Sequence, residues 1–386
     1  MPEMKNIYTT LVIISSLIIN SCITPFEPEG VTTIDNMVVI EGNIILNDTT
    51  KVIISRSLAL NDENKINYIS KASVWVESEK GVRYTGTEVK KGVKIQYNVK
   101  TAGLDPTLKY KLCAVVGGKR YESALIPVLS TPVIDSIGYT PDFEKMSVTF
   151  YVNTHDPLGK TKYYKWSFSE DWEFHSQYHS VAEYNPLTNK ISDIPLSKNR
   201  YYCWGKGVSS SILIATTTHL NEDRVFQKKL ISMGSTDRKI SYLYSLELTQ
   251  MAITKEAYDY WENIRKNSDD IGGIFSPQPS EIAGNIRCIT NPNEKVLGYI
   301  SAATVSKKRS FSYGKDIGVY VEPGNCLTEA VGPENPIPIE DLYLGGFDVV
   351  SFFEDTNESF WAQKSCVDCR LYGTKIKPLF WPTDHI

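Results

Sequence analysis

The chain has 386 residues, with 41 basic and 45 acidic side chains and a formal net charge of −4 at pH 7. Because acidic and basic residues are so evenly balanced, the chain has no basic stripe that could displace the counterions of a nucleic acid. Nucleic acid is therefore not expected as a partner. The length exceeds what one hydrophobic core usually serves, so two or three domains are expected. The 23 tyrosines and the many Thr, Val and Ile residues favour a strand-rich protein.

The first segment has the pattern of an export signal. Lys5 precedes an apolar run from Ile7 to Ile19, which is shorter than the roughly 20 residues that a membrane-spanning helix needs. An apolar run followed by small residues is typical of a secretory signal with its cleavage site. Ser21 before Cys22 suits a lipoprotein signal peptidase. We therefore predict a lipoprotein signal peptide over 1–21, and the alternative is an ordinary signal with an incidental cysteine.

Residues 22–36 favour a tether over a folded element. The stretch is rich in Pro, Gly, Thr and acidic residues and shows no apolar period. We expect diacylglycerol and further acyl modification at Cys22, because two or more acyl chains hold a protein stably on a membrane. No other cofactor is expected.

From residue 37 to residue 127, short apolar strands alternate with Gly and Asn turns. Ala72–Ser78 alternates apolar and polar side chains, which is typical of a half-buried strand. Such strands predict an antiparallel, immunoglobulin-like β-sandwich over 37–127. The expected strands are Met37–Leu46, Lys51–Ser57, Ala72–Ser78, Val82–Thr87, Tyr110–Val116 and Arg120–Ala124.

A Pro- and Ser-rich stretch, Pro127–Pro132, marks a domain boundary. Beyond it we expect a second, fibronectin-III-like β-rich domain over 132–313, so that two sandwiches stand in tandem. Within it, 183–200 is expected to be a long polar loop or insertion. From 314 to 386, many Pro, Gly and acidic residues predict an irregular C-terminal wrap. The strands expected in the second domain are Ser136–Tyr139, Ser147–Asn153, Tyr163–Phe168, Ser210–Thr217, Lys239–Gln250, Val296–Val305 and Arg309–Tyr313.

One helix is expected, over 254–267. Thr254 suits the N-cap, and Glu256 in the first turn complements the helix dipole. Ala257 and Trp261 share an apolar stripe at helical spacing, which is more typical of packing than of a ligand site.

Six cysteines remain in the mature chain, and an even number in an exported protein indicates disulfides, although the sequence alone does not choose among the pairings. A redox or metal role for Cys366 and Cys369 lacks the expected helical context or a second ligand pair. We expect Cys326 to pair with one of these two and Cys113 to be a buried thiol. The other disulfide candidates are Cys203 and Cys288.

The chain contains none of the common catalytic signatures, such as H-E-x-x-H, G-x-S-x-G or a phosphate loop. A weak metal candidate is the group Glu173, His175 and His179, because two imidazoles and a carboxylate at this spacing can share one face of a strand. The more ordinary interpretation is a polar strand end with two unrelated histidines.

Aromatic side chains gather between residues 163 and 178. Tyr164, Trp166 and Phe168 alternate along an expected strand and are predicted to lie in the core. A weak candidate for an exposed binding surface is the set Trp172, Phe174 and Tyr178.

Several motifs follow the lipoprotein start in a fixed order: VVIEGNI, ASVWVES, YYCWG, AYDYW, IAGNIRCITNPNEKVLGYISAATV and CVDCRLYGTKIKPLFW. In this order the chain resembles, nearly end to end, the Bacteroidota lipoprotein family designated domain of unknown function 4249. The resemblance implies a β-rich outer-membrane lipoprotein with a transthyretin-like N-terminal sandwich, often encoded beside a TonB-dependent receptor. Surface-exported lipoproteins often have acids close after the anchor cysteine. Here the acids, Glu27 and Glu29, come later than in that pattern, and surface display is only favoured over the periplasmic face.

Three functions follow from these patterns. The first is a non-enzymatic, outer-membrane-anchored partner of a TonB-dependent nutrient transporter, which captures or passes on a nutrient. The second is a structural or adhesive surface protein, which needs no pocket. The third is an enzyme with an unrecognised site, and it is the least favoured.

Overall fold

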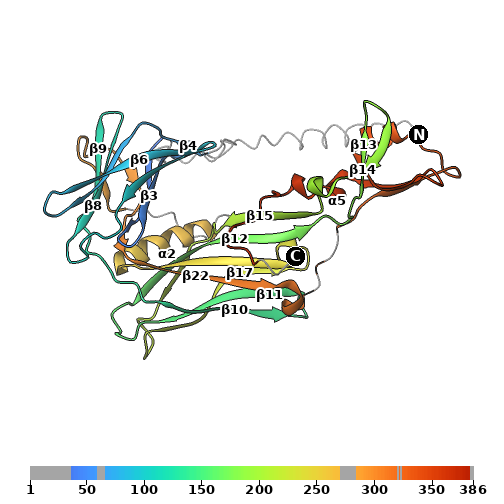
Figure 1. Cartoon of the computed structure of the whole chain (residues 1–386). Coiled ribbons are helices and arrows are strands. Elements are labelled where there is room, and N and C mark those ends of the chain that lie inside the picture. The colour runs from blue at the N-terminus through green and yellow to red at the C-terminus, as the bar shows by residue number, and fades with distance from the viewer. Residues whose placement is uncertain (1–35, 59–65, 270–283, 320, 322–323, 383–386) are drawn as a thin grey trace, which may run out of the picture.

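The structure is a computed structural model that describes residues 36–58, 66–269, 284–319, 321 and 324–382. The predicted signal peptide, Cys22 and nearly all of the tether lie outside these residues. The described chain is mainly β, as predicted, and its strands form several antiparallel sheets (Figure 1). Within the described ranges, no helix has both the length and the apolar character required to cross a bilayer.

The N-terminal domain is a ten-stranded sheet in the order β19-β9-β8-β5-β6-β7-β3-β1-β20, with β4 paired to β3. Inward side chains such as Ile54, Val76 and Tyr97 come from both halves of this sheet and share one core, as a folded-over sandwich requires. The strands are β1 Val38–Gly42, β2 Ile44–Ile45, β3 Thr49–Arg56, β4 Asn67–Tyr68, β5 Ser73–Ser78, β6 Arg83–Lys91, β7 Lys94–Lys100, β8 Tyr110–Val116 and β9 Lys119–Ser123.

Three short strands from late in the chain complete this domain. β19 (Ile286–Cys288) pairs with β9, β20 (Val296–Leu297) runs parallel to β1, and β21 (Ala302–Ala303) runs parallel to β2. The prediction of one strand over Val296–Val305 in the second domain was therefore wrong. Its apolar residues do form strands, but their partners lie far away in the sequence, where local pattern gives no signal.

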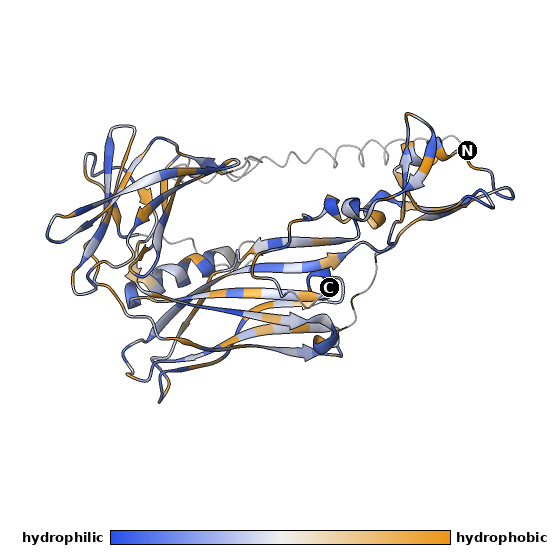
Figure 2. Cartoon of the chain, viewed as in Figure 1, coloured by the Kyte–Doolittle hydropathy of each residue, from blue (hydrophilic) through white to orange (hydrophobic). Residues whose placement is uncertain are grey.

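The central domain packs a three-stranded sheet, β10-β11-β17, against a sheet in which β12 joins β15, β16 and β18, and β18 joins β22. Tyr164, Trp166 and Phe168 are buried between the sheets, as predicted, and hydrophobic and hydrophilic residues alternate along these strands (Figure 2). The strands are β10 Ile134–Asp142, β11 Ser147–His155, β12 Tyr163–His175, β15 Tyr202–Val208, β16 Leu213–Thr216, β17 Arg224–Gly234, β18 Leu243–Ala252 and β22 Val305–Tyr313.

The expected helix is α2 (Lys255–Asp269), and the backbone N–H of Ala257 donates to the hydroxyl of Thr254, 3.2 Å away, as an N-cap bond. Its buried face packs with Ile253 and Ala303, in a small core that also contains Ile45 of the N-terminal domain. This shared core, together with the helix, joins the first two domains.

The distal module (residues 177–200 and 324–369) projects from the central domain at the end opposite the N-terminal domain (Figure 1). The loop predicted over 183–200 was wrong in part, because it contains a hairpin. The wrap predicted over 314–386 was also wrong in part, because it contains a sheet in the order β23-β25-β24. The elements are β13 Ala182–Asn185, β14 Lys190–Asp193, β23 Thr328–Val331, α4 Ile339–Leu344, β24 Phe347–Phe353, β25 Glu358–Gln363 and α5 Lys364–Val367.

Short helical turns complete the description. α3 spans Gly314–Ile317, and the 3₁₀ helices η1, η2 and η3 span Leu196–Lys198, Arg238–Ile240 and Cys369–Leu371. With α4 and α5, these turns are present in addition to α2, the one helix that the sequence predicted.

Two disulfides attach and close the distal module. Cys326 pairs with Cys366, as predicted, and Cys203 on β15 pairs with Cys369. Cys288, a further disulfide candidate, is instead a buried free thiol in the N-terminal domain, and Cys113 is buried and free as predicted. Local sequence does not distinguish Cys288 from the paired cysteines, because Cys288 reaches the N-terminal domain only through the pairing of β19 with β9, which is far away in the sequence.

Candidate ligand-binding pocket

The three weak metal candidates do not form a metal site. Glu173 is buried, accepts a hydrogen bond from Trp381 Nε1 at 3.2 Å, and has its other oxygen 3.5 Å from His175 Nε2. His179 is exposed and has its Nε2 3.1 Å from Asn199 Nδ2. Because β12 ends at His175, the strand alternation that would align His179 stops before it. Nowhere in the described ranges do three His, Cys, Asp or Glu side chains gather as potential metal ligands.

The three aromatic candidates do not form an exposed surface. Phe174 is buried, with 2% of its surface exposed. Trp172 is half-buried, and its ring lies over Gly205 of β15, where the absence of a side chain leaves room for it. Tyr178 packs edge-on against Phe360 with ring centroids 5.6 Å apart. These residues pack within the central domain and against the distal module.

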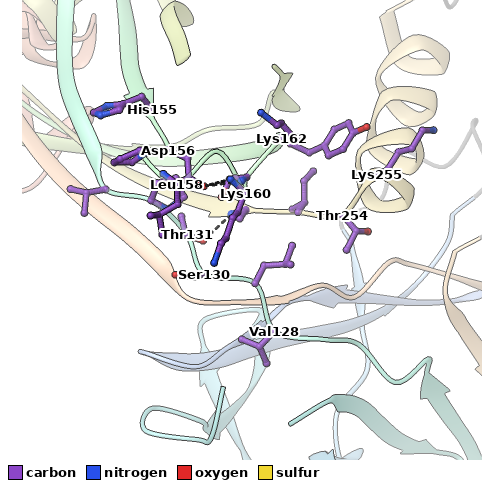
Figure 3. Close-up of a pocket in the computed structure, with 18 of the residues that line it drawn as sticks. Val128, Ser130, Thr131, His155, Asp156, Leu158, Lys160, Lys162, Thr254 and Lys255 are labelled. Carbon is purple, nitrogen blue, oxygen red and sulfur yellow. Dashed lines mark hydrogen bonds between the residues drawn. The ribbon is translucent and has the colours of Figure 1, made fainter. Parts of the chain in front are cut away.

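A pocket of about 670 Å³ opens where the N-terminal and central domains meet (Figure 3). Its walls are the interdomain linker 128–133, the end of β11 with the loop 156–162, and the beginning of α2. The sequence predicted the linker as a domain boundary, but no local pattern indicated that it faces the loop 156–162.

The linker wall of the pocket is fixed by hydrogen bonds. The backbone N–H of Leu129 donates to Ala302 O at 3.0 Å, and the N–H of Thr304 donates to Leu129 O at 3.0 Å. The hydroxyl of Thr131 donates to Thr304 O at 2.5 Å and accepts the N–H of Ala252 at 2.9 Å. Backbone and Thr131 hydrogen bonds between the linker and the segment 302–304 thus hold the two domains together.

Asp156 shapes the opposite wall. Its carboxylate accepts backbone N–H bonds from Leu158, Lys160 and Thr161 at 2.9, 3.0 and 2.8 Å. Burial disfavours the ionised form of Asp156, but these N–H donors outweigh it and lower the pKa of the carboxyl below its ordinary value. The carboxylate is therefore committed to the loop, and it holds that loop in one conformation.

At one side of the pocket, His155 is held by Asp135. Its Nδ1 lies 2.8 Å and 2.9 Å from the two carboxylate oxygens, and Lys308 Nζ donates to the backbone oxygen of Asp135 at 2.6 Å. A carboxylate on one ring nitrogen fixes the orientation of an imidazole. The pair therefore offers a positioned polar group beside the pocket.

Three lysines line the pocket, and they differ in how they are neutralised. Lys255 Nζ is paired with Asp259 at 2.6 Å. Lys160 is exposed and Lys162 is half-buried, and within the described part of the chain neither forms an ion pair. The Asp156 and Asp135 carboxylates also line the pocket, but they are held by the loop N–H groups and by His155, so the two lysine ammonium groups remain local donors for an anion.

Apolar side chains form much of the remaining wall. Val133 and Leu158 are 75% and 74% exposed, and Ile253 and Tyr163 line the pocket beside them. Large apolar side chains exposed around a concave, partly charged surface are typical of a ligand-binding groove.

The fold and this pocket define a mainly β, multidomain protein with a ligand-sized pocket between its first two domains. The chain belongs to the family described as "Domain of unknown function (DUF4249)", whose model matches residues 23–309. That match ends within β22, so the strands β23–β25 lie beyond it. No curated protein is significantly similar to the chain.

Among solved structures, a DUF4785 family protein from Legionella pneumophila is 11% identical and covers 56% of this chain, with a TM-score of 0.16. The chain spans about half of that structure's length, 51%. A similarity this low does not establish a common overall fold.

Proposed function

We propose that this chain is a binding protein that captures a small ligand with an anionic group on an apolar body. The observation that carries the proposal is the combination of two lysines without an ion-pair partner among the described residues, Lys160 and Lys162, with an apolar mouth around Val133 and Leu158. Small-molecule sites typically combine mostly apolar walls with a few placed polar groups. A lysine ammonium is a compact charge that suits a carboxylate or a phosphate.

The framework of the pocket also favours binding. Hydrogen bonds to Ala302 and Thr304 hold the linker wall, and Asp156 holds the loop on the other side. Walls that are already ordered lose little conformational entropy when a ligand enters, so more of the contact energy contributes to affinity.

We further propose that Cys22 carries the lipid and holds the chain at the outer membrane, with surface display favoured. In this account the protein is a non-enzymatic accessory of a TonB-dependent nutrient transporter. The apolar run before Ser21 and Cys22 supports the anchor, and the transporter context rests on what the sequence resemblance implies.

A thermal unfolding experiment tests ligand capture. Octanoate and phenyl phosphate combine one anionic group with an apolar body, whereas 1-octanol has the chain without the charge. We expect both anions to raise the unfolding temperature by about 2 °C or more at saturating concentration, because a ligand that binds only the folded state stabilises it. 1-Octanol should give a smaller shift at the same concentration.

Matched variants locate the binding. Lys160→Gln with Lys162→Gln should remove most of the shift. The control, Lys91→Gln with Lys94→Gln, makes the same charge change at exposed positions on the β6–β7 hairpin and should retain the shift. An equal shift in both double variants, or no shift with either anion, would contradict the proposal.

The anchor and the partner need separate tests. A Cys22→Ser variant should leave the membrane fraction, and continued fractionation with membranes would exclude lipidation at this residue as the anchor. Tagged protein purified from solubilised outer membranes should recover a TonB-dependent receptor. Recovery of the tagged chain alone would contradict the transporter role and leave the ligand test unaffected.

A further inference from the structure

The distal module carries a groove that is separate from the interdomain pocket. Its volume is about 700 Å³, and it lies between the β13–β14 hairpin, the segment 331–339 and the hairpin that joins β24 to β25. Half-buried apolar side chains line it, together with three prolines of the segment 331–339. The apolar side chains that matter most are Ile191, Val331, Ile337, Ile339 and Phe352.

Proline makes one wall of this groove stiff. Pro333, Pro336 and Pro338 all line it, and each fixes its own backbone φ angle. A stiff wall costs little conformational entropy when a partner docks. Close by, Phe353 is 60% exposed at the end of β24, and Leu187 is 94% exposed at the tip of the β13–β14 hairpin. Exposed apolar side chains beside a groove are typical of interaction sites.

The groove lies in an acidic part of the chain, and its charged lining residues are Glu354 and the exposed Lys190. The distal module as a whole has eleven acidic and four basic residues, whereas the whole chain has a net charge of only −4. Residues 324–363 contain eight of the acidic residues and no Lys, Arg or His. Asp348 is buried against Arg200. Six of the others are exposed, and among the described residues none of them forms an ion pair. These six are Glu334, Glu340, Asp341, Glu354, Asp355 and Glu358.

Charge decides what kind of partner fits. A second copy of this chain would place one acidic rim against another, and like charges facing each other oppose association. A membrane surface rich in anionic lipids would repel the rim for the same reason. We propose that the groove of the distal module is a docking surface for a protein partner that presents basic residues around an apolar segment.

The groove shape agrees with this partner. An extended segment with apolar side chains on one face would fill the space beside Ile337 and Phe352, while its Lys or Arg residues would meet Glu354, which lines the groove, and the exposed Asp355 next to it in the chain. The rim charges would speed association and set specificity, and the apolar contacts would hold the complex. This surface functions whether or not the interdomain pocket binds a ligand.

Synthetic peptides test the proposal on the full mature chain by isothermal titration calorimetry. The probe is an eight-residue peptide of alternating Lys and Leu. An alternating Glu and Leu peptide removes the basic character, and an alternating Lys and Ser peptide removes the apolar character. We expect only the Lys–Leu peptide to bind, with an affinity that falls as salt rises. Equal binding of either comparison peptide would overturn the proposal.

Charge reversal at the rim supplies the matched variants. Glu354→Lys with Asp355→Lys lies in an exposed turn between β24 and β25 and should weaken Lys–Leu binding about tenfold. The control, Glu144→Lys with Asp316→Lys, makes the same charge change at exposed sites on the central domain and should weaken it less than about twofold. Equal weakening by both pairs would show that only net charge matters and would overturn the proposal.

Hydrogen exchange places the peptide without any substitution. Slower exchange over 331–339 on addition of the Lys–Leu peptide supports the groove, and protection elsewhere alone overturns it. Sedimentation velocity and flotation with phosphatidylglycerol vesicles test the other occupants. A dimer or vesicle binding that the Glu354→Lys and Asp355→Lys pair abolishes would assign this face to self-association or to lipid and would overturn the proposal.

Discussion

In the N-terminal domain, Cys113 and Cys288 lie buried with free thiols, whereas the cysteines at the distal module, Cys326, Cys366 and Cys369, are all in disulfides. The N-terminal domain folds a ten-stranded sheet around one large core. The distal module has only a small core around Val349 and Trp361 and depends on covalent and ionic links. The difference shows how one exported chain stabilises a large unit by burial and a small unit by cross-links.

The strongest test of this contrast is the buried ion pair of the distal module. Arg200 Nη1 and Nη2 donate to the two oxygens of Asp348 at 2.7 and 3.0 Å. Asp348→Ala leaves a buried guanidinium without its carboxylate, and should destabilise the module by about 3–5 kcal/mol. Hydrogen exchange should show faster opening of β24 and β25, with the N-terminal domain unchanged.

The control for that experiment is an exposed pair in the same module. Lys198 Nζ lies 3.2 Å from Glu183. Because solvent screens this pair, Glu183→Ala should cost less than about 1 kcal/mol. If Asp348→Ala proves as mild as Glu183→Ala, the buried pair does not stabilise the module.

The next effect in size is the loss of the disulfide that fastens the module to β15. Cys203 and Cys369 are 166 residues apart in sequence. Replacing both by Ala removes a constraint on the unfolded chain and should cost about 2–5 kcal/mol. Limited proteolysis should then cut the distal module first. Release of the N-terminal domain before the distal module would contradict the view that the distal module depends more on its cross-links.

A lysine between the N-terminal and central domains is expected to have an effect on stability of intermediate size. Lys165 Nζ lies 3.2 Å from the ring centroid of Trp261 on α2. Burial lowers the pKa of the Lys165 amine to about 7 from its ordinary value of 10.5. Between these two pH values the unfolded chain binds more protons than the folded chain, so the contribution of Lys165 to stability rises with pH and reaches its plateau above 10.5.

Lys165→Met should abolish this pH dependence. Relative to the variant, the native protein should gain about 1–2 kcal/mol of unfolding free energy between pH 7 and pH 9. This gain is smaller than the full pKa difference would give, because Lys165 is half-buried and the Trp261 ring favours the charged amine. Denaturant titrations of both proteins at several pH values check it. Parallel pH profiles would show that the Lys165 pKa is not lowered.

The smallest expected effect concerns the free thiols of the large core. Burial raises the pKa of Cys113 to about 12, so at pH 8 the thiol has almost no reactive thiolate. In a Cys22→Ser chain, a thiol reagent should therefore not label Cys113 until the protein unfolds, and burial alone should keep the reagent from Cys288. Cys113→Ala should cost only about 1 kcal/mol. Rapid labelling of the folded chain would indicate that the core opens more readily than the comparison requires.

The sequence predicted best where local pattern decides structure. β8 has the predicted bounds, because its apolar run is continuous and the Gly117-Gly118 turn ends it. β12 is seven residues longer than predicted, since Glu170 and its acidic neighbours resemble a loop. In the fold, Glu170 accepts hydrogen bonds from Lys239 and Tyr244, which makes burial of its carboxylate tolerable.

The candidate pocket could not be predicted from the sequence, for a different reason. Its linker wall, its Asp156 loop and the start of α2 come from three distant segments, and each segment alone resembles ordinary connecting chain. Only the pairing of the linker with Ala302 and Thr304 brings those walls together. Likewise, the distal groove joins 190–191 to 331–359, whose Pro-rich and acidic composition predicts irregular structure.

The central claim is that the interdomain pocket captures anions with apolar bodies, and a hydrogen-exchange footprint with octanoate tests it most directly. The account predicts slower exchange at residues 128–133 and 156–163, with no such change in the Lys160→Gln and Lys162→Gln double variant. Unchanged exchange in both segments at saturating octanoate, or the same protection in the double variant, would contradict it.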